Sequence, residues 1–313
     1  MIKICLMIPL LAGLFSFGTD STNTVSLKYD STTAGHDTAR INDVDSLSQS
    51  EPDTIYPVNL KLEYPVVKNE AFFVGEKLLF NIRYGFIHAG TATMEVKKEM
   101  LLNDKRVYHI QTTARSASGF SWIYKVEDVI DSYIDKKGLF SWKFDKKLRE
   151  GGYKADFLVD YFPEDSLARI AYTRYKRGMI VTNQEKYQVK TPPFVLDVLA
   201  AFYYTRTQNL QVGQSISITN HDNKKVYDLE VKVYHKEIID TDAGKFRCLF
   251  IEPLLKGEGI FQQKGRLKIW ITDDQYKIPV QMKSEVAVGS ITVELEEIKD
   301  FPHKIPALLT HDD

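Results

Sequence analysis

The chain has 313 residues with 41 Lys or Arg and 42 Asp or Glu, which leaves a formal net charge of −1 at pH 7. This balance excludes the strongly basic field on which many nucleic-acid-binding proteins depend. A disulfide-rich scaffold is excluded too, because only Cys5 and Cys248 occur and Cys5 lies in a leader segment. The 17 Tyr and 17 Phe favour a sheet-rich fold.

Residues 1–18 have the layout of a secretory signal peptide. Lys3 gives a positive start, residues 4–15 form an apolar run too short to span a bilayer, and Ser16 and Gly18 place small residues before a cleavage point at Thr19. A retained N-terminal anchor is the alternative, whereas lipid attachment at Cys5 is disfavoured because too little apolar sequence precedes it. The leader predicts export to the periplasm or the outer membrane, with no transmembrane segment left after cleavage.

Residues 19–60 differ in composition from the rest of the chain. Between residues 19 and 56 there are 13 Ser or Thr, seven acidic residues and two basic residues. Such a segment buries too little apolar surface to offset the entropy of ordering it. We therefore predict a disordered acidic linker at 19–60, a single β domain at 61–301 and a loose tail at 302–313.

From about residue 63 onward, apolar and polar side chains alternate with the period of a half-buried strand. Leu78, Phe80, Ile82 and Tyr84 share one face, opposite Asn81 and Arg83. Similar segments recur about every ten residues and are separated by short polar or glycine-containing turns, which is typical of an antiparallel meander. The pattern predicts an all-β fold.

One segment has helical rather than strand spacing. Val195, Val198, Leu199 and Phe202 recur at helical intervals after the prolines at 192–193. We expect this main amphipathic helix to span about 194–208 and to cover one side of the sheet.

Several phrases resemble those of a bacterial family, domain of unknown function 3108. They occur in the family's order over about residues 66–299, and they are residues 75–80, 84–85, 89–92, 197–206, 267–274, 278–280 and 289–291. The resemblance implies an exported, envelope-associated protein with a large, strongly curved antiparallel sheet, a half-barrel or spiral. It carries over no functional residue. In shape, such a fold is similar to the half-barrels of periplasmic lipoprotein carriers, where a curved sheet cups acyl chains over a helix.

Sequence motifs for catalysis, phosphate binding or metal binding are not found. The seven histidines lack ligand spacing, and neither a nucleophile elbow nor a dinucleotide fingerprint occurs. Asp273 and Asp274 are consistent with a metal or acid–base site, but a strand-end turn explains them better. We therefore predict a protein that is not an enzyme and that uses neither a cofactor nor a metal ion.

Aromatic and helical positions supply the candidate ligand site. The segment 118–124 is suited to gripping a lipid or a glycan or to docking at a membrane, although its rings also fit a tucked loop. A basic cluster at 136–149 surrounds Trp142 and fits either anionic lipid or an ordinary exposed strand. The predicted ligand-binding residues are Phe120, Trp122, Tyr124, Trp142, Val198, Phe202 and Trp270.

These observations favour a non-catalytic envelope protein that binds a lipid or other amphipathic ligand, such as a lipoprotein acyl chain, in the concavity of a curved sheet. One alternative is a structural or protein-interaction module for envelope integrity, whose partner is an envelope protein or peptidoglycan; the flexible linker suits this role. An uncharacterised hydrolase is the remaining alternative. No nucleic-acid partner is expected.

Overall fold

The structure is a computed structural model that describes residues 62–256, 267–285 and 289–310. All of these residues fall in one of the two compact units into which the chain divides. The predicted signal peptide at 1–18 and the predicted linker at 19–60 lie outside the described residues.

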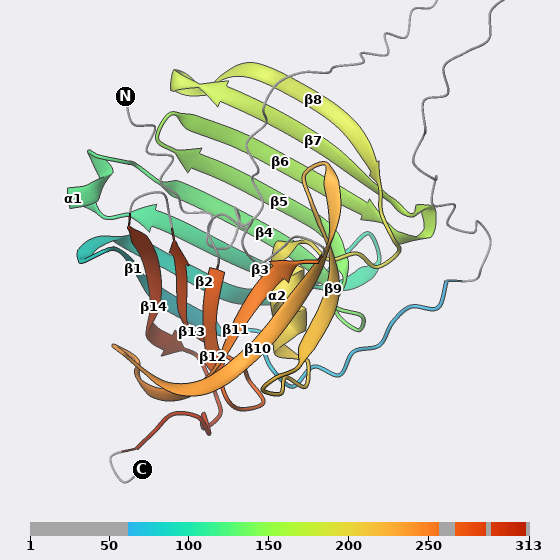
Figure 1. Ribbon diagram of the computed structural model, residues 1–313. Coiled ribbons are helices and arrows are strands. Elements are labelled where there is room, and N and C mark those ends of the chain that lie inside the picture. The colour runs from blue at the N-terminus through green and yellow to red at the C-terminus, as the bar shows by residue number, and fades with distance from the viewer. Residues whose placement is uncertain (1–61, 257–266, 286–288, 311–313) are drawn as a thin grey trace, which may run out of the picture. The chain divides into compact units, whose positions relative to one another are not determined.

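The described residues form one antiparallel sheet of fourteen strands that does not close on itself (Figure 1). The prediction of an all-β, antiparallel fold with one main helix is therefore confirmed. The strands are β1 (Lys77–Tyr84), β2 (Ile87–Leu102), β3 (Lys105–Ser116), β4 (Glu127–Asp135), β5 (Ser141–Glu150), β6 (Tyr153–Phe162), β7 (Leu167–Lys176), β8 (Ile180–Lys190), β9 (Ser215–Asp222), β10 (Lys225–Thr241), β11 (Gly244–Leu255), β12 (Leu267–Thr272), β13 (Pro279–Glu285) and β14 (Ser290–Lys299). The helices are α1 (Ser118–Ser121) and α2 (Val198–Arg206), with 3-10 turns η1 (Pro163–Asp165) and η2 (Arg177–Met179).

The first and last strands meet in the middle of the sheet. The spatial order runs from β8 back to β1, then directly to β14, and from there back to β9. Strand β1 pairs along its whole length with β14, from Lys77 opposite Lys299 to Tyr84 opposite Ile291. We call β1–β8 the N-terminal arm, β9–β14 the C-terminal arm and the β1–β14 pairing the seam.

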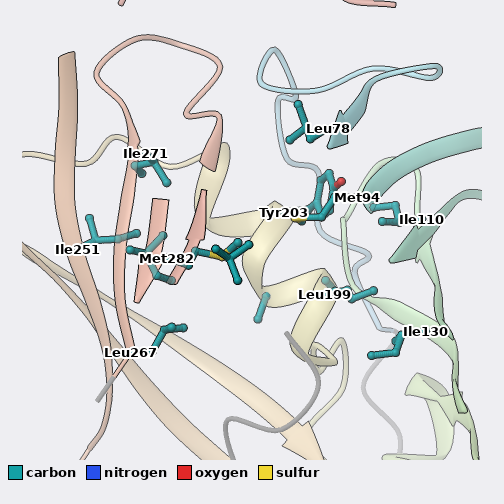
Figure 2. Packing of buried hydrophobic residues seen from close by; sticks show 14 of the residues in the cluster. Leu78, Met94, Ile110, Ile130, Leu199, Tyr203, Ile251, Leu267, Ile271 and Met282 are labelled. Carbon is teal, nitrogen blue, oxygen red and sulfur yellow. The ribbon is translucent and has the colours of Figure 1, made fainter. Parts of the chain in front are cut away.

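Strand alternation places one row of apolar side chains from each arm on the face that carries α2, which we call the inner face. Figure 2 shows the N-terminal arm on one side of α2 and the C-terminal arm on the other, with Leu199 and Tyr203 of the helix between them. Both helix residues are completely buried. The labelled strand residues that join them in the core are Leu78, Met94, Ile110, Ile130, Ile251, Leu267, Ile271 and Met282.

Helix α2 begins later than its periodicity predicts. The expected start near Phe194 is wrong because Phe194 has a positive φ of 59° and Leu196 forms a β-bridge with Asn220 of strand β9. The buried Asp197 is the N-cap, and its Oδ1 accepts hydrogen bonds from the backbone N–H groups of Leu199 and Ala200. The chain between β8 and α2 therefore makes a turn at Phe194 and is held to the sheet at Leu196 before the helix begins.

The cap also fixes the helix to the N-terminal arm. The second carboxylate oxygen of Asp197 accepts hydrogen bonds from Ser132 of β4, at 2.7 Å, and Ser141 of β5, at 2.6 Å. Burial raises the pKa of Asp197, while the hydrogen bonds from Ser141, Ala200, Ser132 and Leu199 oppose that rise. A buried carboxyl group with this many donors sets the position of the first turn of α2.

At the other end of the helix, Arg206 is 1% exposed and forms a two-pronged ion pair with Glu76, with N–O distances of 2.6 and 2.8 Å. Its remaining donors reach the carbonyl oxygens of Ala71, before β1, and Tyr276, before β13. One side chain thus joins the helix to the segment before β1 in the N-terminal arm and to the segment before β13 in the C-terminal arm.

The segment after Pro302 is more ordered than its composition suggests. A loose tail at 302–313 is the sequence-based expectation, yet Leu308 forms a β-bridge with Phe246 of β11 and Ala307 is completely buried. Asp274 accepts a hydrogen bond from the Ala307 backbone N–H at 3.2 Å. The backbone of the tail thus pairs with an edge of β11, an arrangement that composition alone does not reveal.

We expect Arg206→Met to lower the free energy of unfolding by about 3–5 kcal/mol, because it leaves the Glu76 carboxylate buried without its partner. Urea denaturation monitored by circular dichroism measures this loss. Lys68→Met is the matched control, because its partner Glu70 is exposed and the expected change is about 1 kcal/mol or less. Equal losses for the two variants would contradict the role given to Arg206.

Candidate ligand site on the inner face

The structure distributes the seven predicted ligand-binding residues over four places. Phe120, Trp122 and Tyr124 lie in and after α1, where the sequence suggested a loop. Phe120 is buried, Tyr124 is partly buried and Trp122 is 82% exposed. Ser121 closes the short helix by donating a hydrogen bond to the Ala117 carbonyl oxygen.

Trp142 belongs to an internal aromatic cluster at the opposite end of β5. Its indole Nε1–H donates to Asp135 at 3.1 Å, and its ring packs against Phe140 and Tyr64. The Lys105 ammonium lies 5.1 Å from the ring centroid. The Trp142 indole is therefore in contact with other residues of the same chain on several sides.

Val198 and Phe202 lie on α2 and pack partly buried against the core. Trp270 lies on the outer face of the C-terminal arm, where it stacks on Phe250 and donates to Glu237 at 2.6 Å. Phe120, Trp122 and Tyr124 therefore lie near one another around α1, and Val198 and Phe202 lie near one another on α2, but the seven residues do not form one site.

A different set of residues gathers on the inner face of β5–β8, beyond the part that α2 covers. Here the rings of Phe157 and Tyr172 pack with their centroids 4.7 Å apart and their planes tilted by 37°, and the Arg174 guanidinium lies 4.1 Å from the Tyr153 centroid. These four side chains are each partly buried rather than sealed in the core. We call Tyr153, Phe157, Tyr172 and Arg174 the aromatic face.

Charged groups border the aromatic face on the side of the C-terminal arm. Lys146 of β5 is 3% exposed, lies over the Phe157 ring and forms an ion pair with Asp222 at 3.1 Å. Next to Asp222, His221 bonds through Nδ1 to the buried Tyr161 hydroxyl at 3.1 Å. Burial lowers the pKa of His221 to about 4, so its ring is neutral at physiological pH.

The basic residues of the 136–149 cluster do not all lie on one face of the sheet. Lys146 points to the inner face, whereas Lys147 on the outer face pairs with Asp145 at 3.0 Å. The β9–β10 turn brings Asp222 over the inner face, and Asn223 in this turn accepts a hydrogen bond from Tyr187 of β8. The sequence signal for Lys146 is its place in a strand between Phe144 and Leu148, on their side of the sheet.

Two acidic side chains meet beside the aromatic face. Asp128 is 3% exposed, and its Oδ1 accepts a hydrogen bond from the Arg149 backbone N–H at 2.7 Å. Among the described residues, its buried Oδ2 accepts no hydrogen bond from an amide or a hydroxyl group. The Glu150 carboxyl group lies beside that of Asp128, close enough for the two to shift each other's pKa.

Burial raises the pKa of Glu150 to about 8, and the negative charge and hydrogen bond of Asp128 act in the same direction. Burial also raises the pKa of Asp128, against the hydrogen bond from Arg149. Two carboxyl groups in contact resist double ionisation, so the pair shares one proton near neutral pH. It presents a hydrogen-bonding edge with a single negative charge beside Arg174 and Lys146.

Within residues 62–256, 267–285 and 289–310, no group of three or more His, Cys, Asp or Glu side chains is arranged to hold a metal ion. The same ranges contain no helix with the length and apolar character required to cross a bilayer. Cys248 is completely buried, and burial raises the pKa of its thiol to about 12.

The acid pair predicts a specific pH dependence of stability. Between the ordinary carboxyl pKa and about 8, the folded chain retains a proton that the unfolded chain releases, so the free energy of unfolding falls as pH rises through this window. Glu150→Gln keeps the shape of the protonated acid, and we expect it to reduce the fall by roughly 1–3 kcal/mol.

Urea denaturation at several pH values between about 5 and 8 measures this slope. Glu127→Gln is the control, because it removes an exposed carboxylate of the same region that pairs with Lys125. An unchanged slope in Glu150→Gln would show that the pair does not share a proton.

Comparison with known proteins gives a family and three solved structures of low sequence identity. One is a β-barrel-like protein of domain of unknown function DUF1849 from Brucella abortus, with 9% identity and a TM-score of 0.44, covering 75% of this chain and 98% of that one. Two others have 12% identity: a protein described as exported with a YmcC-like fold from Bacteroides fragilis, and one described as a lipoprotein from Parabacteroides distasonis. Their TM-scores are 0.33 and 0.31; each covers 75% of this chain, with 98% and 97% of the respective structures.

No curated protein matches the chain. The family model for protein of unknown function DUF3108 matches residues 79–296, which is most of the sheet and all of α2. The resemblance inferred from the sequence motifs is therefore confirmed. The chain belongs to the DUF3108 family of proteins of unknown function.

Proposed function

We propose that this protein is an exported, non-catalytic binding protein of the cell envelope, which takes an amphipathic ligand on the aromatic face of its N-terminal arm. The observation that carries the proposal is the division of the inner face into two parts. Under α2 the side chains are packed and sealed, whereas Tyr153, Phe157 and Tyr172 remain partly accessible. Partly accessible rings beside charged groups suit a ligand with an apolar and a polar portion.

The charges next to these rings define the polar portion of the ligand. Arg174 offers hydrogen-bond donors, and the shared-proton pair of Asp128 and Glu150 offers both a donor and an acceptor edge. A ligand such as a lipid or acylated molecule with a hydroxyl-bearing or anionic head group matches this combination. A purely hydrocarbon ligand matches it poorly, because it would leave these groups without hydrogen bonds.

Export is supported by the leader at residues 1–18, with its short apolar run and small residues before Thr19. The proposal of binding without catalysis draws on the roles of the buried polar groups. Asp197 caps a helix, and Asp274 accepts hydrogen bonds from Thr272 and the backbone of Tyr276 and Lys277. Each of these carboxylates is engaged in local structure.

A second candidate is the protein-interaction module. Strand β8 stands at the end of the sheet order, with β7 as its neighbour among the described strands. Its first five residues, Ile180 to Gln184, form a continuous exposed stretch. An edge of this kind can accept an additional strand from a partner.

Native mass spectrometry of the processed chain from its own envelope, followed by lipid extraction, tests the first proposal. A co-purifying lipid or acylated species would support binding on the aromatic face. Recovery of ligand-free protein under gentle conditions, with no uptake of added fluorescent fatty acids or lipopeptides, would overturn it and favour the interaction module.

We expect Tyr172→Ser to weaken binding of a fluorescent lipopeptide by about tenfold or more, because it removes the ring that packs against Phe157. Tyr175→Ser is the matched control, since Tyr175 lies on the opposite face of β7, where its hydroxyl donates to Asp156. Fluorescence anisotropy measures both affinities. Equal losses, or a loss confined to Tyr175→Ser, would exclude the inner face as the site.

A further inference from the structure

The strand register brings four turns of the N-terminal arm to one end of the sheet. These turns join β1 to β2, β3 to β4, β5 to β6 and β7 to β8, and we call them the rim. Residues next to these turns are paired across neighbouring strands, which places all four turns at the same end of the sheet. The pairs are Tyr84 with Ile87, Gly90 with Ser116, Arg115 with Glu127, Val126 with Glu150, Glu150 with Tyr153, Lys154 with Tyr175 and Lys176 with Ile180. Helix α1 marks this end in Figure 1.

Close packing holds the rim turns in place. A Cβ atom on Gly90 would lie 2.1 Å from the Arg115 carbonyl oxygen, so glycine is required where β2 meets β3. The Ala117 backbone N–H donates to the Ala89 carbonyl oxygen, and the Gly151 backbone N–H donates to that of Lys125. These hydrogen bonds join the β3–β4 turn to the end of β2 on one side and to the β5–β6 turn on the other.

Large apolar side chains on three of these turns point into solvent. Phe86 is fully exposed and Trp122 is 82% exposed. Others on the rim are more than two-fifths exposed: Ile87, Ile123, Met179, Ile180 and Val181. At the opposite end, the turns between β2 and β3, β4 and β5, and β6 and β7 contribute Leu101 to the exposed large apolar residues, and the segment that packs on the β4–β5 turn adds Val66 and Tyr64.

The same rim is positively charged. Its charged side chains outside the acid pair are five basic residues and one acidic residue, namely Arg115, Lys125, Lys154, Lys176, Arg177 and Glu127. The acid Glu127 pairs with Lys125, and four basic residues remain beyond that pair. Neither the acidic linker predicted at 19–60 nor the chain as a whole, with its net charge of −1, has such an excess of positive charge.

We propose that the rim docks on the surface of an anionic phospholipid bilayer. Exposed Trp, Phe and aliphatic side chains insert at the level of the head groups, and basic residues between them are attracted to anionic lipid. A protein partner would have to match three turns separated along a curved edge, whereas a fluid lipid surface needs only apolar and positive groups at a common level.

Docking rests on the rim alone and does not require the proposed ligand binding. If both hold, the aromatic face opens toward the membrane, because Glu150 and Tyr153 lie at the strand ends that form the rim. An amphipathic molecule would then pass between the bilayer and the inner face without crossing water.

Vesicle flotation with the processed chain, recovered from the exported fraction, tests the proposal. The probes are vesicles of equal parts phosphatidylcholine and phosphatidylglycerol, and vesicles of phosphatidylcholine alone. We expect binding to the anionic vesicles at low salt, a marked loss at high salt and little binding to the neutral vesicles. A blue shift of tryptophan emission on binding, absent in Trp122→Phe, would report insertion of this residue.

Two double variants separate the contributions. Trp122→Ser/Ile123→Ser removes apolar anchors, and Lys176→Glu/Arg177→Glu reverses charge; we expect each to weaken binding about tenfold. The controls are Leu101→Ser/Ile238→Ser, exposed apolar positions away from the rim, and Lys137→Glu/Lys190→Glu, exposed basic positions at the opposite end. Circular dichroism verifies that all four fold.

Equal binding of the rim variants and the wild type would overturn the proposal, as would flotation that is insensitive to salt and lipid charge. Concentration-dependent dimerisation that Trp122→Ser/Ile123→Ser abolishes, without flotation, would assign the rim to a second copy of the chain instead. Loss of lipopeptide binding in Tyr172→Ser with unchanged flotation would show that docking and ligand binding are separate properties.

Discussion

The Arg206–Glu76 ion pair is the constraint on which the arrangement of the two arms depends. A completely buried guanidinium must have its charge compensated and its donors satisfied, and here Glu76, Ala71 and Tyr276 do both. These partners come from segments that precede β1 and β13, so the geometry is met only when both arms stand in their native relation to α2. Apolar packing alone, which is non-directional, would allow the helix to slide between them.

The inner face consequently serves two purposes. Where Asp197 and Arg206 anchor α2, the helix fills the space between the arms and its side chains form the core. Beyond the helix, the β9–β10 turn brings Asp222 to Lys146, and the neighbouring rings are no longer sealed. The helix that was expected to line a ligand cavity instead consolidates the sheet, and the accessible aromatic side chains lie farther out on β6 and β7.

Local patterns predicted the strands well because alternation has a period of two, and a half-buried sheet enforces it at every residue. The position of Leu78, Phe80 and Ile82 in the core follows directly from that pattern. The candidate site was less predictable. Trp142 and Trp270 were chosen by residue type, but both side chains pack against and hydrogen-bond to other residues of the chain. The ion pair between Lys146 and Asp222 joins strands β5 and β9, which are far apart in the sequence, so no local pattern predicts it. The shared proton of Asp128 and Glu150 is equally invisible in sequence, since the two lie on different strands.

The seam has a consequence for the order in which the chain reaches its native state. Strand β1 is made early, but its second neighbour, β14, ends at Lys299, so more than two hundred residues must emerge before the pairing can form. Until then β1 presents an open edge in a nascent meander, and contacts of such long sequence separation form slowly. A chain built in this way gains its last cooperative contacts only after synthesis is almost complete, so the two halves of the sheet cannot be joined while the chain is still being made.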